Sequence, residues 1–156
     1  MAELTFFCGK MGAGKSTRAR TLADRDDVIL ISEDAWLAGL YPGQVQSLED
    51  YLRCSAALMS QIKPLVQSLL VAGVDVVMDF PANTVRQRGA LKAIADEVGA
   101  QHRLQVIDTP DQVCLERIRQ RALDDPSRQA TDTESMFAAT SAHFTLPSAS
   151  EGLRVG

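Results

Sequence analysis

The sequence predicts one α/β domain in which a mostly parallel sheet is covered by helices on both faces. The chain has 156 residues, a length that suits one ordinary domain. Its composition is 46% hydrophobic and 23% charged, which is typical of a globular protein. Short apolar segments alternate with longer segments of helical periodicity, and this alternation indicates parallel strands joined by crossover helices.

Five short segments are predicted as strands because each is apolar and is bounded by polar residues or glycine. In chain order they are residues 4–8, 28–31, 74–79, 104–107 and, as a short final strand, 153–155.

Residues 15–23 follow the first strand and are predicted as a helix. Residues 48–70 carry apolar side chains at helical spacing on one face, and Pro64 within them predicts a kink or a division into two helices. Gly73 is expected to end this helix, because glycine readily adopts the left-handed conformation of a helix end.

Three further helices are expected from their start signals. Thr84 and Gln87 have the spacing of a capping box, and that helix should end near Gly99. Thr109 is the expected cap of the next helix, with a proline at its first position. Thr131 is the expected cap of the last helix, with a glutamate three residues later.

The bulk composition disfavours several classes of partner. A net charge of −4 and a pI near 5.1 argue against duplex nucleic acid. The 3 cysteines are widely spaced, so neither a disulfide framework nor a zinc site is expected. No long apolar stretch or leader pattern is found, so a cytoplasmic protein without a membrane partner is expected. The sequence leaves open whether it is a monomer or a homodimer.

The strongest motif is Gly-Lys-Met-Gly-Ala-Gly-Lys-Ser at residues 9–16, which fits the P-loop pattern GxxxxGK[ST]. Glycines let successive backbone amides turn toward phosphate oxygens, and the following helix adds its positive end. Lys15 can reach the β- and γ-phosphates, and the Ser16 hydroxyl can join the shell of Mg²⁺. We expect ATP, or GTP as an alternative, to be bound with Mg²⁺ by Met11, Gly12, Ala13, Gly14, Lys15, Ser16 and Thr17.

Two carboxylates follow predicted strands, where ligands gather in open α/β sheets. Asp79 closes the third strand and is the expected partner of Mg²⁺; the alternative is a cap for the turn that follows. Asp34 lies just past the second strand and is the expected base for an attacking hydroxyl. Asp34 could instead cap the helix around Trp36, and Ser32 or Glu33 could compete as the base.

Arg117 and Arg121 lie one helical turn apart, directly before the polar segment 122–130. We expect residues from about 117 to 131 to form a lid in which both arginines close over the γ-phosphate. The alternative is a solvated basic face. Arg119 and Arg128 are weaker candidates for the same role.

Other side chains could border the acceptor, although an ordinary position is favoured for each. Arg86 and Arg88 are expected to be surface charges, and Trp36, Tyr41 and Phe144 to pack in the core. Between residues 34 and 73 the only basic residues are Arg53 and Lys63. A neutral hydroxylated acceptor is therefore preferred over a nucleoside monophosphate.

With these residues the chain resembles the small P-loop kinases related to zeta toxin, chloramphenicol phosphotransferase and polynucleotide 5′-hydroxyl kinase. The similar segments are GKMGAGKST at 9–17, SEDAW at 32–36, VVMDF at 76–80 and CLERIRQR at 114–121. SEDAW and DFPANT look most like a bacterial branch of this group described only as ATP-binding proteins or kinases.

The resemblance implies a three-layer P-loop NTPase fold with a five-stranded parallel sheet in the order 2-3-1-4-5. It also implies Asp34 as base, Asp79 near Mg²⁺, and Arg117 and Arg121 as lid arginines. The leading hypothesis is a kinase that moves the γ-phosphate of ATP to a hydroxyl of a small molecule or a nucleic-acid end. The alternatives are a nucleotide-dependent switch or ATPase, and a nucleoside monophosphate kinase.

Overall fold

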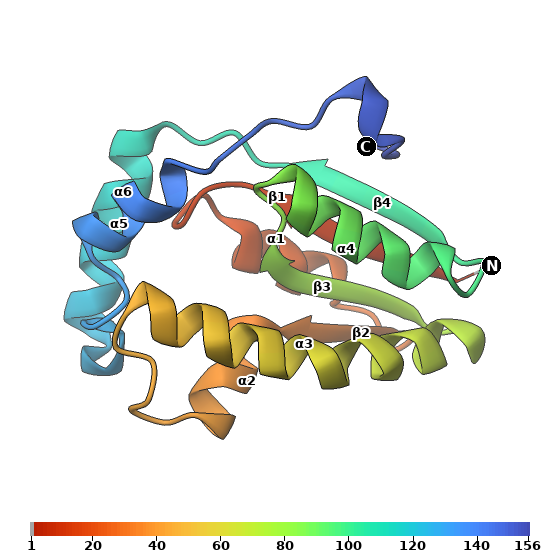
Figure 1. Ribbon diagram of the computed structural model, residues 1–156, viewed down its shortest axis with the longest axis horizontal. Helices are drawn as coiled ribbons and strands as arrows, with labels where there is room; N and C mark the ends of the chain where they lie inside the picture. The colour runs from red at the N-terminus through yellow and green to blue at the C-terminus, as the bar shows by residue number, and fades with distance from the viewer. Residues whose placement is uncertain (1) are drawn as a thin grey trace.

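The sheet consists of four parallel strands in the order β2-β3-β1-β4 (Figure 1). The computed structural model describes residues 2–156. The strands are β1 (Glu3–Cys8), β2 (Val28–Ser32), β3 (Asp75–Pro81) and β4 (Gln101–Val106). The predicted α/β class is confirmed, and the order agrees with the first four positions of the expected 2-3-1-4-5.

The expected fifth strand at 153–155 is wrong. Only one residue pair, Leu104 with Val155, forms a bridge to β4. A short 3₁₀ helix, η2 (Ala149–Glu151), and Gly152 with φ of +67° precede it directly. The turn therefore leaves only a brief extended segment beside β4, and two backbone hydrogen bonds hold it there: Leu104 N to Arg154 O and Gly156 N to Leu104 O.

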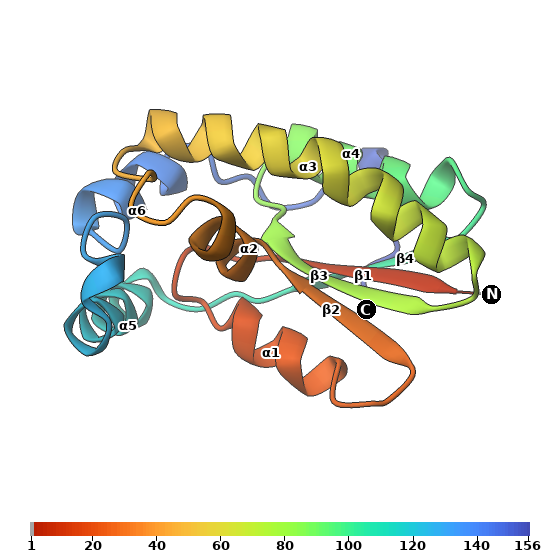
Figure 2. The same ribbon diagram turned by 90° about the horizontal axis from the view of Figure 1, so that it is seen from below.

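Helices cover both faces of the sheet, as Figure 2 shows. Helix α1 (Lys15–Leu22) lies on one face, and α3 (Leu48–Val71) and α4 (Val85–Asp96) lie side by side on the other. The larger core is on the α3–α4 side, where Phe6, Met78 and Ile62 are fully buried.

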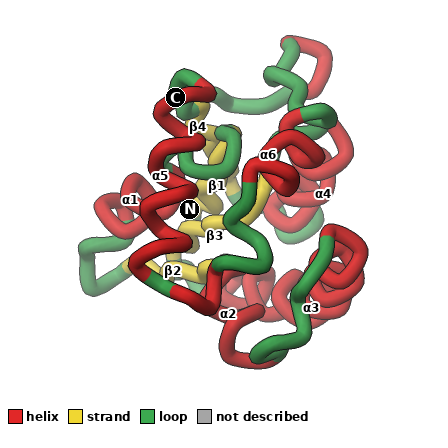
Figure 3. Tube along the Cα trace, turned by 90° about the vertical axis from the view of Figure 1, so that its left-hand side faces the viewer, coloured by secondary structure: helices red, strands yellow, loops and turns green. Residues whose placement is uncertain are grey.

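Three helices gather beyond the carboxyl ends of the strands (Figures 1 and 3). They are α2 (Glu33–Leu40), α5 (Asp111–Asp124) and α6 (Glu134–Ser141), with the 3₁₀ turn η1 (Pro126–Arg128) between the last two. Since parallel strands all end at this edge, the residues that follow them come together there.

Pro64 lies inside α3 without dividing it, because the helix runs unbroken over 24 residues. The expected division into two helices is therefore wrong. Gly73 adopts a φ of +85° directly after the helix, and its amide donates to the carbonyl of Leu70. The predicted glycine end of this helix is confirmed.

The predicted caps are right at one helix start and misplaced at two. Thr84 accepts from the amide of Gln87 and caps α4, as expected. Thr109 does not cap α5; its hydroxyl donates to the carbonyl of Ala13 in the phosphate loop at 2.7 Å. Thr133, not Thr131, caps α6 by accepting from Met136.

Arg88 is fully buried, so the expectation of a surface charge is wrong. Its Nε donates to Glu151 Oε1 at 2.7 Å, and its Nη1 donates to the carbonyl of Thr145 at 2.7 Å. This arginine ties the C-terminal segment to α4, and the paired Glu151 compensates for burial of the charge. Among residues 2–156, no helix is both long and apolar enough to cross a membrane.

Candidate active site

The phosphate loop joins β1 to α1 and needs glycine at two positions. Gly12 has a φ of +74° and Gly14, which precedes α1, has a φ of +108°. A Cβ atom at Gly12 would lie 2.6 Å from the backbone oxygen of Cys114. The loop therefore owes its shape both to the left-handed backbone and to close packing against α5.

The ammonium of Lys15 points back into the loop. It donates to the carbonyls of Gly9 and Lys10, the second at 3.3 Å. Burial lowers the pKa of Lys15, while the carboxylates of Asp79 and Asp34 oppose this shift. A cation held this way, next to turned backbone amides, is suited to bind phosphate oxygens.

Asn83 holds the start of the loop in place, a contact that the sequence reasoning missed. Its Oδ1 accepts from the amide of Gly9 at 2.9 Å. Asn83 lies two residues beyond the end of β3. In the sequence, only this position at the carboxyl edge of the sheet indicates that Asn83 could belong to the site.

Ser16 and Asp79 meet at the entry to α1. The Ser16 hydroxyl donates to Asp79 Oδ2 at 2.5 Å. Strand β3 continues through Asp79 to Pro81, so this carboxylate does not close the strand as expected. Hydroxyl and carboxylate oxygens are the ligands that Mg²⁺ prefers, and this donor set fits the ion.

Acidic, histidine and cysteine side chains form no cluster of three that could hold a metal within residues 2–156. A magnesium ion bound by Ser16 and Asp79 would therefore complete its shell with phosphate oxygens and water. This is how Mg²⁺ is usually held in P-loop sites.

Asp34 lies in the first turn of α2 and lines the same cavity as Lys15 and Ser16. Ser32 caps the helix instead, by accepting from the amide of Ala35 at 3.5 Å. The Asp34 side chain is 54% exposed. It is therefore open to an incoming hydroxyl at the cavity and is not engaged as the cap.

Glu33, the neighbour of Asp34, is only 3% exposed. Its carboxylate accepts from the hydroxyl of Tyr51 and, at 2.7 Å, from that of Ser55, both on α3. Burial raises the pKa of Glu33 to about 7, and the two hydroxyl donors oppose this rise. These contacts fix the start of α2 against α3, and with it the position of Asp34.

Arg121 and Arg128 share one buried carboxylate, Asp132, whose side chain is 1% exposed. Arg128 Nε donates to Asp132 Oδ2 at 2.5 Å, and Arg121 Nε lies 3.2 Å from the same oxygen. Arg128 Nη2 also lies 3.4 Å from Asp34 Oδ2. Sequence reasoning missed Asp132, which lies beside the polar lid segment, and ranked Arg128 only as a weaker lid candidate.

Arg117 does not line this cavity. Its Nη1 donates to the carbonyl of Gly12 at 3.1 Å, and the same atom lies near Gly14. The structure thus places Arg117 against the phosphate loop, whereas Arg121 faces the cavity with Arg128. Of the seven loop residues from Met11 to Thr17, Gly14 and Thr17 are not in the cavity wall either.

The cavity that joins these groups has a volume of about 660 Å³, within the range of small-molecule sites. Figure 3 looks along the strands at the end where α2, α5 and α6 gather, and residues of these three helices line the cavity. Tyr41 and Phe144 both pack against the main core as expected, and Tyr41 also lines the cavity. Trp36 is 37% exposed, so its expected core position is wrong.

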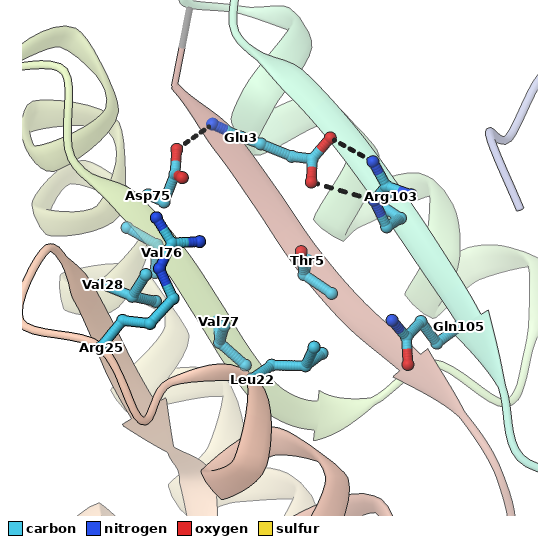
Figure 4. Close-up of a pocket in the computed structure, with 10 residues that line it drawn as sticks. All are labelled: Glu3, Thr5, Leu22, Arg25, Val28, Asp75, Val76, Val77, Arg103 and Gln105. Atoms are coloured by element: carbon cyan, nitrogen blue, oxygen red, sulfur yellow. Dashed lines mark hydrogen bonds and ion pairs between the residues drawn. The ribbon is translucent and has the colours of Figure 1, made fainter. Parts of the chain in front are cut away.

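A second cavity, of about 210 Å³, lies on the α1 face near the amino ends of the strands (Figure 4). Its acidic side chains are already hydrogen-bonded: Glu3 accepts from Arg103 at 3.0 Å, and Asp75 accepts from the amide of Glu3 at 2.8 Å. None of its lining residues comes from the phosphate loop. It is therefore separate from the candidate site.

Comparison with solved structures supports the fold. A Chloroflexus aurantiacus protein matches with a TM-score of 0.78 and 17% identity, over 99% of this chain and 85% of that chain. A sugar kinase from Janibacter sp. matches with a TM-score of 0.67 and 18% identity, over 100% and 85%. The APS kinase of Mycobacterium tuberculosis, in complex with AMPPNP and APS, matches with a TM-score of 0.60 and 17% identity. The match covers 94% of this chain and 83% of that chain.

The family match is broader than any single motif. The model of the AAA domain family AAA_33 matches residues 4–147, from β1 through the segment that follows α6. It includes the phosphate loop, Asp34, Asp79 and the arginines of α5. The chain therefore belongs to the AAA_33 family of AAA domains, a P-loop kinase-like family.

Proposed function

We propose that the protein is a kinase that transfers the γ-phosphate of ATP to a hydroxyl group, with Mg²⁺ as cofactor. The observation that supports it most is the convergence of Lys15, the Ser16–Asp79 pair and Asp34 in one cavity. The phosphate loop contacts the triphosphate and not the nucleobase, so GTP is an alternative phosphoryl donor. In this proposal residues 1–156 act as one domain.

Each group has one role in the transfer. Lys15 and the amides of residues 11–17 hold the β- and γ-phosphates. Asp34 accepts the proton of the acceptor hydroxyl while the hydroxyl oxygen bonds to the γ-phosphorus. The bond from this phosphorus to the bridging oxygen breaks, which leaves ADP and a phosphorylated acceptor.

Magnesium would neutralise charge on the phosphate oxygens, and Ser16 and Asp79 would hold it directly or through water. Residues 117–131 serve as the lid. Within it Arg121 and Arg128 stabilise the charge of the transferring phosphoryl group, because both line the cavity. Arg117 supports the loop through its contact with Gly12.

The test is transfer from γ-labelled ATP to a pool of small metabolites. The wild-type protein should label at least one hydroxylated compound. Asp34→Asn should lower that rate by about 100-fold or more, the scale of a lost general base. Asp26→Asn, an exposed aspartate outside the cavity, is the control and should leave the rate unchanged. Release of free phosphate with no labelled acceptor would favour the ATPase alternative.

A further inference from the structure

The cavity has a charged end at the phosphate loop and an uncharged end beside α2 and α3. None of the lining residues between Leu37 and Leu52 carries a charge. Four apolar side chains from residues 41–52 line this end. We call them the apolar wall: Tyr41, Val45, Leu48 and Leu52.

Part of the apolar wall is open to water. Leu52 is 57% exposed although it lines the cavity, and Leu48 is half-buried. Removing such surface from water is favourable and roughly proportional to the area covered. An apolar ligand at this end would therefore be stabilised by covering these side chains.

The basic side chains Lys10, Lys15, Arg121 and Arg128 belong to the phosphate loop and the lid, and each is already engaged. Lys10 Nζ lies 2.9 Å from Asp111 Oδ1, and Lys15 donates to carbonyls of the loop. Arg121 and Arg128 are paired with Asp132. Among the described lining residues, an anionic acceptor would meet no cation at the apolar wall.

Carboxylates mark the junction between the two ends. Asp34 lies there, and the carboxylate of neighbouring Glu33 already accepts hydrogen bonds from the hydroxyls of Tyr51 and Ser55. An anionic substituent of the acceptor at the apolar wall would lose hydration against apolar side chains. The phosphates of a nucleic-acid end would face the same cost, since such ends are bound through basic residues.

We infer that the acceptor is an uncharged alcohol with an apolar body, which packs against the apolar wall and presents its hydroxyl to Asp34. This inference rests on the proposed function and names the substrate class of the same site. The cavity volume of about 660 Å³ suits a small molecule.

Binding of N-phenyl-1-naphthylamine, a neutral apolar fluorophore, tests the wall without any phosphoryl transfer. The wild-type protein should bind it with increased fluorescence. Leu52→Glu should weaken this binding by about tenfold or more, because a carboxylate would be brought against apolar surface. Val71→Glu is the matched control on the same helix; Val71 is 71% exposed and does not line the cavity. Its affinity should match the wild type.

Folded wild-type protein that fails to bind the fluorophore would overturn the inference, as would equal affinities of the two variants. A second arm displaces the fluorophore with 2-phenylethanol or with its carboxylated analogue 4-(2-hydroxyethyl)benzoate. The neutral alcohol should be effective at about tenfold lower concentration. Displacement by the carboxylate at equal or lower concentration would contradict an uncharged acceptor.

Calorimetry with Mg-ATP in the same preparations separates this inference from the proposed function. Leu52→Glu should keep the wild-type affinity for Mg-ATP, because Leu52 lies at the uncharged end. Fluorophore binding without Mg-ATP binding would contradict the kinase proposal alone. Mg-ATP binding without fluorophore binding would contradict the apolar acceptor alone.

Discussion

Arg128 in η1 contacts Asp34 at the start of α2, with Nη2 of the arginine 3.4 Å from Oδ2 of the aspartate. The contact joins residues 94 positions apart and brings the lid segment to the proposed base. Because Asp132 holds the same guanidinium, the position of Arg128 depends on a buried carboxylate outside the phosphate loop.

The first prediction concerns the two lid arginines. Arg121→Gln and Arg128→Gln should each lower the transfer rate by about tenfold to a thousandfold, because each removes positive charge from the transferring phosphoryl group. The affinity for Mg-ATP should change less than the rate. Arg119→Gln, on the same helix as Arg121, is the control, since Arg119 pairs with Glu134 outside the cavity. Equal rates for all three variants would remove the arginines from the mechanism.

Asp132 should matter for stability as well. Asp132→Asn leaves Arg121 and Arg128 without their shared carboxylate, and we expect the free energy of unfolding to fall by about 1–3 kcal/mol. The expected loss of stability is moderate because both arginines are partly exposed to water. Urea denaturation measures it, with Asp124→Asn at an exposed aspartate as the control. A loss no larger than that of the control would mean that Asp132 does not anchor the arginines.

The requirement for glycine in the phosphate loop gives a third prediction. Gly12→Ala would place a Cβ atom 2.6 Å from the Cys114 oxygen at a φ of +74°. We expect a loss of about 2–4 kcal/mol and much weaker Mg-ATP binding. Gly39→Ala is the control, because a Cβ there meets no atom within 4 Å and the residue lies within α2. That change should be neutral or slightly stabilising. Wild-type stability in both variants would contradict this account of the loop.

Glu33 predicts a specific dependence of stability on pH. Burial raises its pKa from an ordinary value of 4.5 to about 7 in the folded protein. Between these values the folded state keeps a proton that the unfolded state releases, so the free energy of unfolding falls as pH rises. The loss is on the order of 3 kcal/mol by pH 8.

Glu33→Gln removes this loss while it keeps the shape of the side chain. Relative to the wild type, the variant should become more stable as the pH rises from 5 to 8, which urea denaturation at both values measures. Glu49→Gln, at an exposed residue of α3, is the control and should parallel the wild type. A difference between Glu33→Gln and wild type that does not change with pH would show that Glu33 does not take up a proton on folding.

Local patterns predicted most of the fold. The four paired strands, the glycine end of α3 and the Thr84 cap depend on residues close in sequence, and all are confirmed. The phosphate loop lies between β1 and α1 as predicted, because its glycines determine its conformation locally.

Contacts between distant segments could not be predicted. Arg88 is buried because Glu151, 63 positions later, returns to meet it. Arg117 meets the loop because Cys114 and Ile118 of α5 pack against Ala13, which fixes the face that α5 presents. The sequence shows that Arg117 and Arg121 share a helix face, but not how that face meets the loop.

Calorimetric titration of Mg-ATP tests the central claim, that the loop around Lys15 binds a triphosphate. The wild-type protein should bind with one site, and Lys15→Ala should weaken binding by about 100-fold, because a charge-assisted contact to phosphate is lost. Lys63→Ala, at a partly exposed lysine on α3 paired with Glu97, should bind as the wild type does. Folded wild-type protein that takes up neither Mg-ATP nor Mg-GTP, or equal affinities of the two variants, would contradict the account.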